Sequence, residues 1–191
     1  QQEITRDGEP PDPAVQIIAN PTHKGKGYAV QTGMRKARGE FVFFMDADLS
    51  TPLSEILSFL SVFSSEPDTD IIIGSRALDR KKVLLRQSLP REYMGRFFNI
   101  LVQWLFPLGI SDTQCGFKAF RHRVVEPIFA KQKTTGFAFD VEILWIAQLM
   151  GFSIKALPVL WRNSKTSRVR VILDPISMFF DLLQIRLRHR Q

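Results

Sequence analysis

The stretch Phe41–Ser50, which reads FVFFMDADLS, is an apolar run that ends in two aspartates one residue apart. Alternate side chains of an extended chain lie on the same side, so we expect Asp46 and Asp48 to lie together and Ala47 to point away. Neighbouring carboxylates repel each other unless a cation lies between them, and oxygen ligands suit Mg²⁺ or Mn²⁺. The stretch therefore predicts a site for a divalent metal and a diphosphate at the carboxyl end of a parallel strand.

The same two aspartates also have a purely structural interpretation. Asp48 would cap the following helix, and Asp46 would be a solvated turn residue. A D-x-D pattern by itself is compatible with both interpretations.

The composition of the 191-residue chain, 45% hydrophobic and 24% charged, is typical of one globular domain with a sizeable core. Its formal net charge of +7 indicates an anionic partner, such as phosphate, nucleic acid or an acidic membrane surface. The single cysteine, Cys115, excludes an intramolecular disulfide and is expected to be a small buried hydrophobe. No segment reaches the ~18 uninterrupted apolar residues that span a bilayer.

The chain divides into a loop at residues 1–14, which contain three prolines, and a single domain at 15–191. Strands are expected at Val15–Ala19, Glu40–Met45, Asp70–Gly74 and Phe152–Trp161. Helices are expected at Gly25–Ala37, Pro52–Ser64, Met94–Phe106, Phe139–Met150 and Ile176–Arg188. Strands that alternate with helices of this length predict an α/β fold with a mostly parallel, Rossmann-like sheet flanked by helices, with amphipathic helices toward the carboxyl end.

The apolar spacing within three of these helices predicts which side chains face inward. Asp140 is expected to cap the helix at 139–150. The expected inward residues are Leu53, Ile56, Leu57 and Leu60, then Met94, Phe97, Phe98, Leu101 and Leu105, and finally Ile176, Phe179, Phe180, Leu183 and Leu187.

Five short segments follow one another along the chain: Lys24–Gly27 (KGKG), Asp46–Asp48 (DAD), Gly74–Arg76 (GSR), Asp112–Lys118 (DTQCGFK) and Phe137–Glu142 (FAFDVE). In this order they resemble the family 2 inverting glycosyltransferases of GT-A fold, and among them the dolichyl-phosphate β-glucosyltransferase type. The resemblance covers nearly everything from Lys24 to Arg188.

The resemblance implies metal-dependent transfer of glucose from UDP-glucose to a polyprenyl phosphate of the dolichyl type, with inversion. Asp46 and Asp48 would hold Mg²⁺ or Mn²⁺ against the UDP diphosphate. Backbone amides of the glycine-containing turn would approach an anion, although a solvated basic turn is the alternative. The residues expected to bind the nucleotide sugar are Lys24, Gly25, Lys26, Gly27, Asp46, Ala47, Asp48, Ser75 and Arg76.

A phosphate acceptor is mostly dianionic at neutral pH, because its second pKa is about 6, so it needs cations more than a general base. The resemblance implies that Arg91, Arg96, Asn99, Ser167 and Arg168 bind this phosphate, where Arg168 replaces the lysine of relatives. The alternative is a basic solvated face beside acidic lipid.

Asp112 is expected to be a base or to orient the acceptor-binding cations, and its structural alternative is a turn before Cys115. The expected catalytic residues are Asp48, Asp112 and Arg91.

Relatives begin with two further strands and a helix that supply the uridine pocket, and this chain lacks their sequence patterns. The chain therefore resembles a member truncated at its amino end, with an unpaired edge at Val15–Ala19 and without a membrane anchor ahead of it. The resemblance implies a peripheral protein at the cytoplasmic face of a membrane.

Three alternatives to this function are a related transferase for another sugar or acceptor, such as mannose, an inactive fragment, and a basic nucleic-acid-binding module. Ser50 stands where mannose-type synthases carry glutamine, which favours glucose. The seven arginines and lysines of residues 76–96 suggest the module. Against it, the aromatic residues lie in apolar periodic stretches, so a nucleic-acid partner is not expected.

Overall fold

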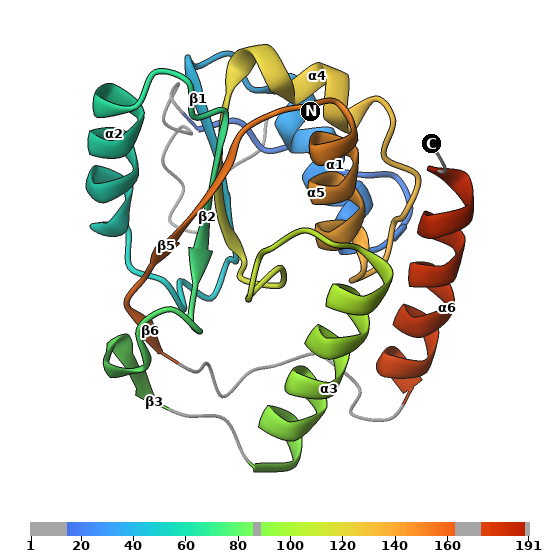
Figure 1. The fold of residues 1–191 in the computed structure, drawn as a ribbon. Coiled ribbons are helices and arrows are strands. Elements are labelled where there is room, and N and C mark those ends of the chain that lie inside the picture. The colour runs from blue at the N-terminus through green and yellow to red at the C-terminus, as the bar shows by residue number, and fades with distance from the viewer. Residues whose placement is uncertain (1–14, 86–88, 163–172, 190–191) are drawn as a thin grey trace, which may run out of the picture.

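The computed structural model describes residues 15–85, 89–162 and 173–189. Figure 1 shows a central sheet with helices on both of its faces. The helices are α1 (Lys26–Lys36), α2 (Glu55–Ser65), the 3₁₀ helix η1 (Arg80–Lys82), α3 (Leu89–Leu105), α4 (His122–Phe129), α5 (Phe139–Leu149) and α6 (Leu173–Arg188). The strands are β1 (Phe41–Met45), β2 (Ile71–Ser75), β3 (Val83–Leu85), β4 (Phe117–Arg121), β5 (Ile154–Pro158) and β6 (Trp161–Arg162).

The main sheet has the strand order β1-β4-β2-β5, and β4 runs antiparallel to both of its neighbours. β2 and β5 pair in parallel, and β1 shares their direction because it too is antiparallel to β4. The α/β fold expected from the sequence is confirmed, with β4 as an unpredicted strand that separates β1 from β2. Since Phe117 lies opposite Met45, the amino end of β4 meets the carboxyl end of β1 at one edge of the sheet.

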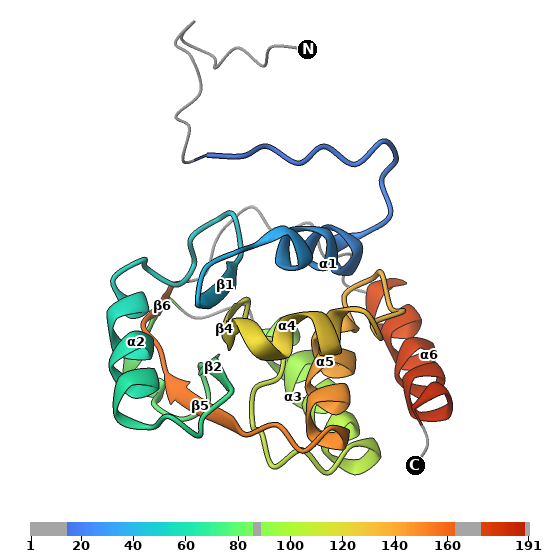
Figure 2. The ribbon, with the colours of Figure 1, turned by 90° about the horizontal axis from the view of Figure 1, so that it is seen from above.

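Alternating side chains of the strands build the two apolar layers of the core. In β1, Phe41, Phe43 and Met45 pack toward α2, whereas Val42 and Phe44 pack toward α1, α4 and α5. Figure 2 shows α2 on one side of the sheet and these three helices on the other. Nearly all of α5 is buried, because the sheet covers one side of this helix and α3 and α6 cover the other.

The predicted strands before Asp46 and before Arg76 are confirmed as β1 and β2, and the predicted helices correspond to α1, α2, α3, α5 and α6. The strand expected at Val15–Ala19 is wrong: this segment is extended chain, and Val15 and Ile17 are exposed. A strand is stabilised by the backbone hydrogen bonds of a neighbour. No described strand pairs with this segment.

The inward faces predicted for three helices are partly wrong, because each helix carries apolar residues on two sides and the periodicity does not say which side the core covers. The predicted inward residues that are exposed are Leu53, Leu57, Phe97, Phe179, Phe180, Leu183 and Leu187. The buried residues of these helices include Phe59 and Phe63 in α2, Val102 in α3, and Leu182 and Ile185 in α6. The side chain of Ile176 lies outside the described residues.

None of the helices in the described part of the chain has both the length and the apolar character needed to cross a bilayer.

Candidate active site

Four chain segments meet at the sheet edge where β1 and β2 end. Asp46 follows β1, and its backbone N–H donates to the carbonyl of Gly116 at 2.9 Å, just ahead of β4. Arg76 follows β2, and its backbone N–H donates to Asp112 Oδ2 at 2.9 Å. Trp161 reaches the same edge after β5. The antiparallel direction of β4 thus brings the DTQCG segment beside the aspartate pair.

Asp46 forms an ion pair with Lys26 of α1, and Oδ1 lies 2.7 Å from Nζ. Burial lowers the pKa of Lys26, but Asp140, Asp46 and Asp48 outweigh it, so the net pKa lies above its ordinary value. Gly116 lies directly against this carboxylate: a Cβ at Gly116 would be 2.0 Å from Asp46 Oδ2. The close contact explains why a residue without a side chain stands there.

The aspartate pair lies in a turn and not along the extended chain that the sequence predicted. β1 ends at Met45, the N–H of Leu49 donates to the carbonyl of Asp46 at 3.0 Å, and Leu49 has a φ of 50°. Asp48 does not cap α2, whose N-cap is Ser54. Instead Asp48 Oδ1 accepts from the backbone N–H of Ser50 at 3.0 Å, so one of its carboxylate oxygens stabilises the turn.

The two aspartates fit a dication that binds together with a diphosphate. No group of three or more His, Cys, Asp and Glu side chains within residues 15–85, 89–162 and 173–189 is placed to hold a metal on its own. Mg²⁺ is usually held by one or two carboxylates, with water and substrate phosphate completing its shell. Asp46 already contacts a cation, the Lys26 ammonium, and its side chain is 38% exposed, which leaves it open to a ligand.

The turn from Lys24 to Gly27, which the sequence predicted to bind phosphate through its backbone amides, packs against the loop before α5. Gly25 has a φ of 99°, and a Cβ there would be 2.4 Å from the carbonyl oxygen of Thr135. The N–H groups of Gly27 and Tyr28 donate to that same oxygen at 2.8 and 3.4 Å. These glycines therefore let α1 pack against the loop before α5, and those two amides are used within the protein.

Lys24 is exposed and lies over the ring of Tyr28, with 4.7 Å between Nζ and the ring centroid. Among the side chains of this turn, Lys26 is the one with a described contact to the aspartate pair. Ala47 is an exposed residue of the turn that follows β1.

Arg76 and Asp112 form a two-point ion pair at the end of β2. Asp112 Oδ2 accepts from Nε at 2.8 Å, and Oδ1 accepts from the terminal guanidinium nitrogen at 2.7 Å. Burial raises the pKa of Asp112, but Arg76 lowers it by a larger amount, so the net pKa is below its usual value. Both oxygens are occupied, and the geometry favours the orienting role of Asp112 over the role of a base. Ser75 is fully buried, and its Oγ accepts from the N–H of Ala77 at 3.3 Å.

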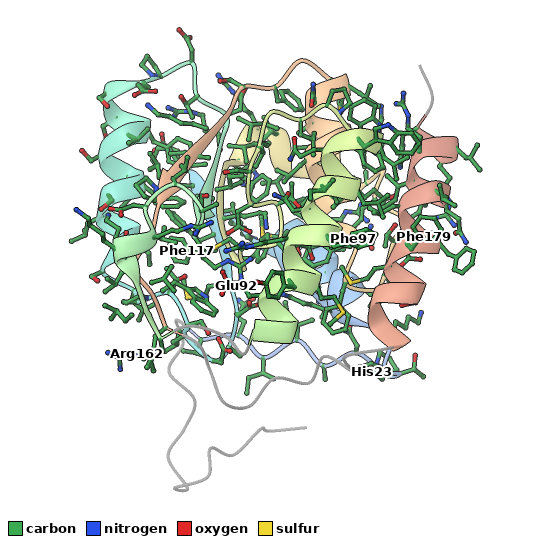
Figure 3. The ribbon with its side chains drawn as sticks, turned by 60° about the horizontal axis from the view of Figure 1, so that its bottom comes forward. His23, Glu92, Phe97, Phe117, Arg162 and Phe179 are labelled. Carbon is green, nitrogen blue, oxygen red and sulfur yellow. The ribbon has the colours of Figure 1, made fainter. Side chains whose placement is uncertain are left out.

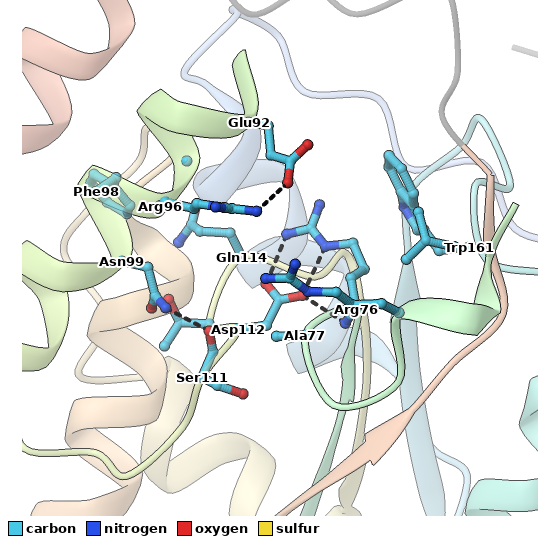
Figure 4. A pocket seen from close by; sticks show the side chains of 14 residues that line it. Arg76, Ala77, Glu92, Arg96, Phe98, Asn99, Ser111, Asp112, Gln114 and Trp161 are labelled. Carbon is cyan, nitrogen blue, oxygen red and sulfur yellow. Dashed lines mark hydrogen bonds and ion pairs between the residues drawn. The ribbon is translucent and has the colours of Figure 1, made fainter. Parts of the chain in front are cut away.

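A cavity of about 270 Å³ lies between this ion pair and α3. Figure 4 shows Glu92, Arg96 and Asn99 of α3 across the cavity from Trp161. Arg96 pairs with Glu92 at 2.6 Å, and Asn99 Nδ2 donates to the carbonyl of Ser111 at 2.7 Å. The cavity brings together the predicted residues Arg76, Arg96, Asn99 and Asp112.

Three predicted site residues cannot be placed in this cavity. The side chain of Arg91 lies outside the described residues, although its backbone belongs to α3, and so do Ser167 and Arg168 as whole residues. Residues that the sequence did not single out also line the cavity, namely Arg80, Glu92, Gln114 and Trp161. Two of these residues could have been found from the sequence, because Arg80 lies in the arginine-rich run at 76–96 and Gln114 lies in the DTQCGFK string.

Lys118 and Asp140 form a buried ion pair close to Cys115. Lys118 is fully buried and donates to Asp140 Oδ1 at 2.5 Å and to the carbonyl of Cys115 at 2.7 Å. Burial raises the pKa of Asp140 and outweighs the ammonium groups of Lys118 and Lys26, which lower it, so the net pKa lies above its usual value. Asp140 therefore does not cap α5 as predicted, and the N-cap of that helix is Ala138. Burial also raises the pKa of Cys115 to about 11, so this thiol is the buried apolar group expected from the sequence.

The arrangement of the sheet and its helices is that of the glycosyltransferases of GT-A fold. A solved structure of glucosyl-3-phosphoglycerate synthase from Mycobacterium tuberculosis, in complex with Mn²⁺, UDP and glucosyl-3-phosphoglycerate, matches 92% of this chain and 56% of its own with a TM-score of 0.60 and 17% identity. Mannosyl-3-phosphoglycerate synthase from Rubrobacter xylanophilus matches 86% of this chain and 50% of its own, also with a TM-score of 0.60, at 16% identity. At this identity the likeness shows the fold.

The chain belongs to glycosyl transferase family 2, whose model matches residues 2–129. It is 34% identical over 185 residues to a dolichyl-phosphate beta-glucosyltransferase of Trichomonas vaginalis, which covers 93% of this chain and 53% of the relative. It is 34% identical over 179 residues to the dolichyl-phosphate beta-glucosyltransferase of Homo sapiens, with 92% and 55% covered. The chain spans about half the length of these relatives, and the predicted family is confirmed.

Proposed function

We propose that this chain carries the catalytic edge of an inverting, metal-dependent glucosyltransferase that uses UDP-glucose and a dolichyl-type polyprenyl phosphate. The observation that carries the proposal is the placement of the Asp46–Lys26 pair and the arginine-lined cavity at one edge of the sheet. One part suits a metal-bound diphosphate and the other suits an acceptor phosphate. Family membership and the names of the relatives support the same activity.

The donor half of the site would be formed by Asp46, Asp48 and Lys26. The two carboxylates would hold Mg²⁺ or Mn²⁺, which when bound neutralises the charge that develops on the leaving UDP. The raised pKa of Lys26 keeps its ammonium protonated at neutral pH. This ammonium would therefore add a second positive charge to the same diphosphate.

The acceptor half of the site would be formed by Arg76, Arg80 and Arg96, which line the cavity. A phosphate monoester is already mostly dianionic near neutral pH, since its second pKa is about 6. Its oxygen would form the new bond to the sugar carbon from the side opposite the departing UDP, which inverts the configuration. Asp112 would hold Arg76 in place without accepting a proton, and Arg91, Ser167 and Arg168 stay predicted contacts of this phosphate.

A membrane surface is the proposed source of the lipid acceptor, at the cytoplasmic face. Tyr93, Phe97, Ile100 and Trp104 are exposed at helical spacing along α3, and Trp104 is 79% exposed. Figure 3 labels Phe97 on α3 and Phe179 on α6, and both side chains are exposed. Exposed apolar side chains beside a basic cavity suit an interfacial contact with anionic lipid.

Product formation from radiolabelled UDP-glucose and a polyprenyl phosphate tests the proposal. We expect lipid-extractable label from the unaltered chain with Mn²⁺, and at least 100-fold less from Asp46→Asn. Asp68→Asn is the matched control, because Asp68 is an exposed carboxylate in the turn before β2. Equal turnover by Asp46→Asn would refute the metal site, and the absence of labelled product from the unaltered chain would refute the proposed activity.

A further inference from the structure

Two residues that line the cavity each carry a buried side-chain polar atom without a hydrogen-bond partner. Within the described residues, the side-chain atoms in this condition are Asn99 Oδ1, Gln114 Nε2 and Gln132 Oε1. Asn99 and Gln114 both line the cavity beside Arg76 (Figure 4). Buried polar groups are nearly always paired, so two unpaired atoms on residues of one cavity call for a partner, and a bound ligand can supply it.

The orientation of the Asn99 amide excludes it as a phosphate donor. Its Nδ2 donates to the carbonyl of Ser111 at 2.7 Å, and only a donor can face that oxygen. The atom left over is Oδ1, which can only accept. An accepting oxygen repels a phosphate oxygen, so the contact between Asn99 and the acceptor phosphate expected from the sequence does not suit this arrangement. A hydroxyl group, which can donate, does suit it.

The Gln114 amide offers the complementary group. Its Nε2 can only donate, and both oxygens of the nearby Asp112 already accept from Arg76. The flanking residues Thr113 and Cys115 are buried, which holds Gln114 at the cavity. An unpaired donor and an unpaired acceptor in one cavity match sugar hydroxyls, because a hydroxyl both donates and accepts. A phosphate oxygen would satisfy only Gln114, and a polyprenyl tail would satisfy neither.

We propose that Asn99 and Gln114 bind the hydroxyls of the hexosyl group of the donor and thereby determine which nucleotide sugar the enzyme accepts. This inference rests on the proposed function, since it places the hexosyl group of the donor in the same cavity, next to the acceptor phosphate that receives it. Sites that pair their polar atoms with a substrate hydroxyl discriminate strongly against analogues that lack it.

Titration calorimetry with Mn²⁺ and either UDP or UDP-glucose tests the inference, because it separates sugar recognition from diphosphate binding. Gln114→Met keeps the side-chain length and removes the donor, and Asn99→Leu removes the acceptor. For each variant we expect the affinity for UDP-glucose to fall about tenfold while the affinity for UDP stays within twofold. Gln148→Met is the matched control, since Gln148 is exposed on α5 and does not line the cavity. Thermal unfolding checks that each variant is folded.

Two results would overturn the inference in distinguishable ways. If UDP binds and the preference for UDP-glucose over UDP is unchanged in a folded Gln114→Met, this assignment fails and the proposed function stands. If the unaltered chain binds neither UDP nor UDP-glucose, the proposed function fails and the assignment falls with it.

Discussion

The contact between Gly116 and Asp46 leads to a sharp prediction for Gly116→Ala. The added Cβ would be 2.0 Å from Oδ2 and 2.3 Å from Cγ of Asp46, so the carboxylate must move by more than an ångström to restore normal contact. Gly116 is not among the described residues with positive φ, so the backbone itself accepts alanine. The displaced carboxylate would leave Lys26 and lose its position for a dication.

The magnitudes for Gly116→Ala differ between stability and binding. The Asp46–Lys26 pair is partly exposed, so its loss costs about 0.2–1 kcal/mol, or at most about 4 °C in melting temperature for a chain of this length. Misplacing a group that orients a metal ligand typically costs about 10–100-fold in metal affinity. We therefore expect the affinity for Mn²⁺ with UDP to fall 10–100-fold in a protein that melts almost normally.

Titration calorimetry and thermal unfolding measure these two quantities on the same samples. Gly33→Ala is the matched control: a Cβ at Gly33 meets nothing within 4 Å, and alanine within a helix is favoured over glycine by about 1 kcal/mol. The control should be slightly more stable and bind Mn²⁺ with UDP normally. Unchanged binding by Gly116→Ala would refute the reasoning that Asp46 is the metal-holding group.

Three further predictions concern the buried charges and the exposed face of α3. Asp112→Asn should lower the free energy of unfolding by about 3 kcal/mol, because it leaves a guanidinium with a weaker partner. The pKa of Asp112 in the folded state lies below its unfolded value of about 3.9, so this difference in unfolding free energy is constant at neutral pH. The difference shrinks below about pH 4, and urea titrations at several pH values measure it. Lys118→Met should cost about 3–5 kcal/mol by stranding Asp140, and adding Asp140→Leu should recover most of it in the same titrations. Trp104→Ser should weaken sedimentation with anionic vesicles with little change in melting temperature, whereas Leu57→Ser, on the exposed side of α2, should not.

A specific result would contradict each of these three predictions. A stability difference for Asp112→Asn that grows on acidification would contradict the lowered pKa. A double variant no more stable than Lys118→Met would show that the lysine does not act through Asp140. Equal vesicle binding by Trp104→Ser and the unaltered chain would remove α3 from the membrane contact.

Local sequence patterns predicted the elements whose character is set by their own residues. β1 and β2 are apolar runs bounded by polar residues, and both are confirmed. β4 could not be recognised in this way, because Lys118 interrupts its apolar pattern and becomes compatible with burial only through Asp140, 22 residues away. The predicted inward faces of α3 and α6 were partly wrong for a related reason: the choice between two apolar sides depends on α5, against which both helices pack.

The same limit applies to the candidate site. The motif strings predicted that Asp46, Arg76 and Asp112 converge, and the structure brings them to one sheet edge. The strings did not predict that Asp112 is occupied by Arg76, since that pairing depends on the order of β2 and β4. The unpaired atom of Gln114 likewise became visible only once the cavity and its hydrogen bonds were known.

The antiparallel placement of β4 limits where the chain can gain or lose residues. Successive residues of this strand face opposite layers: Phe117 and Ala119 pack toward α2, while Lys118 and Phe120 pack toward α5. Losing one residue here would invert every side chain of the strand and place the ammonium among the phenylalanines under α2. Length changes should therefore be tolerated better at exposed positions outside the strand, where they do not shift its pairing with β1 and β2.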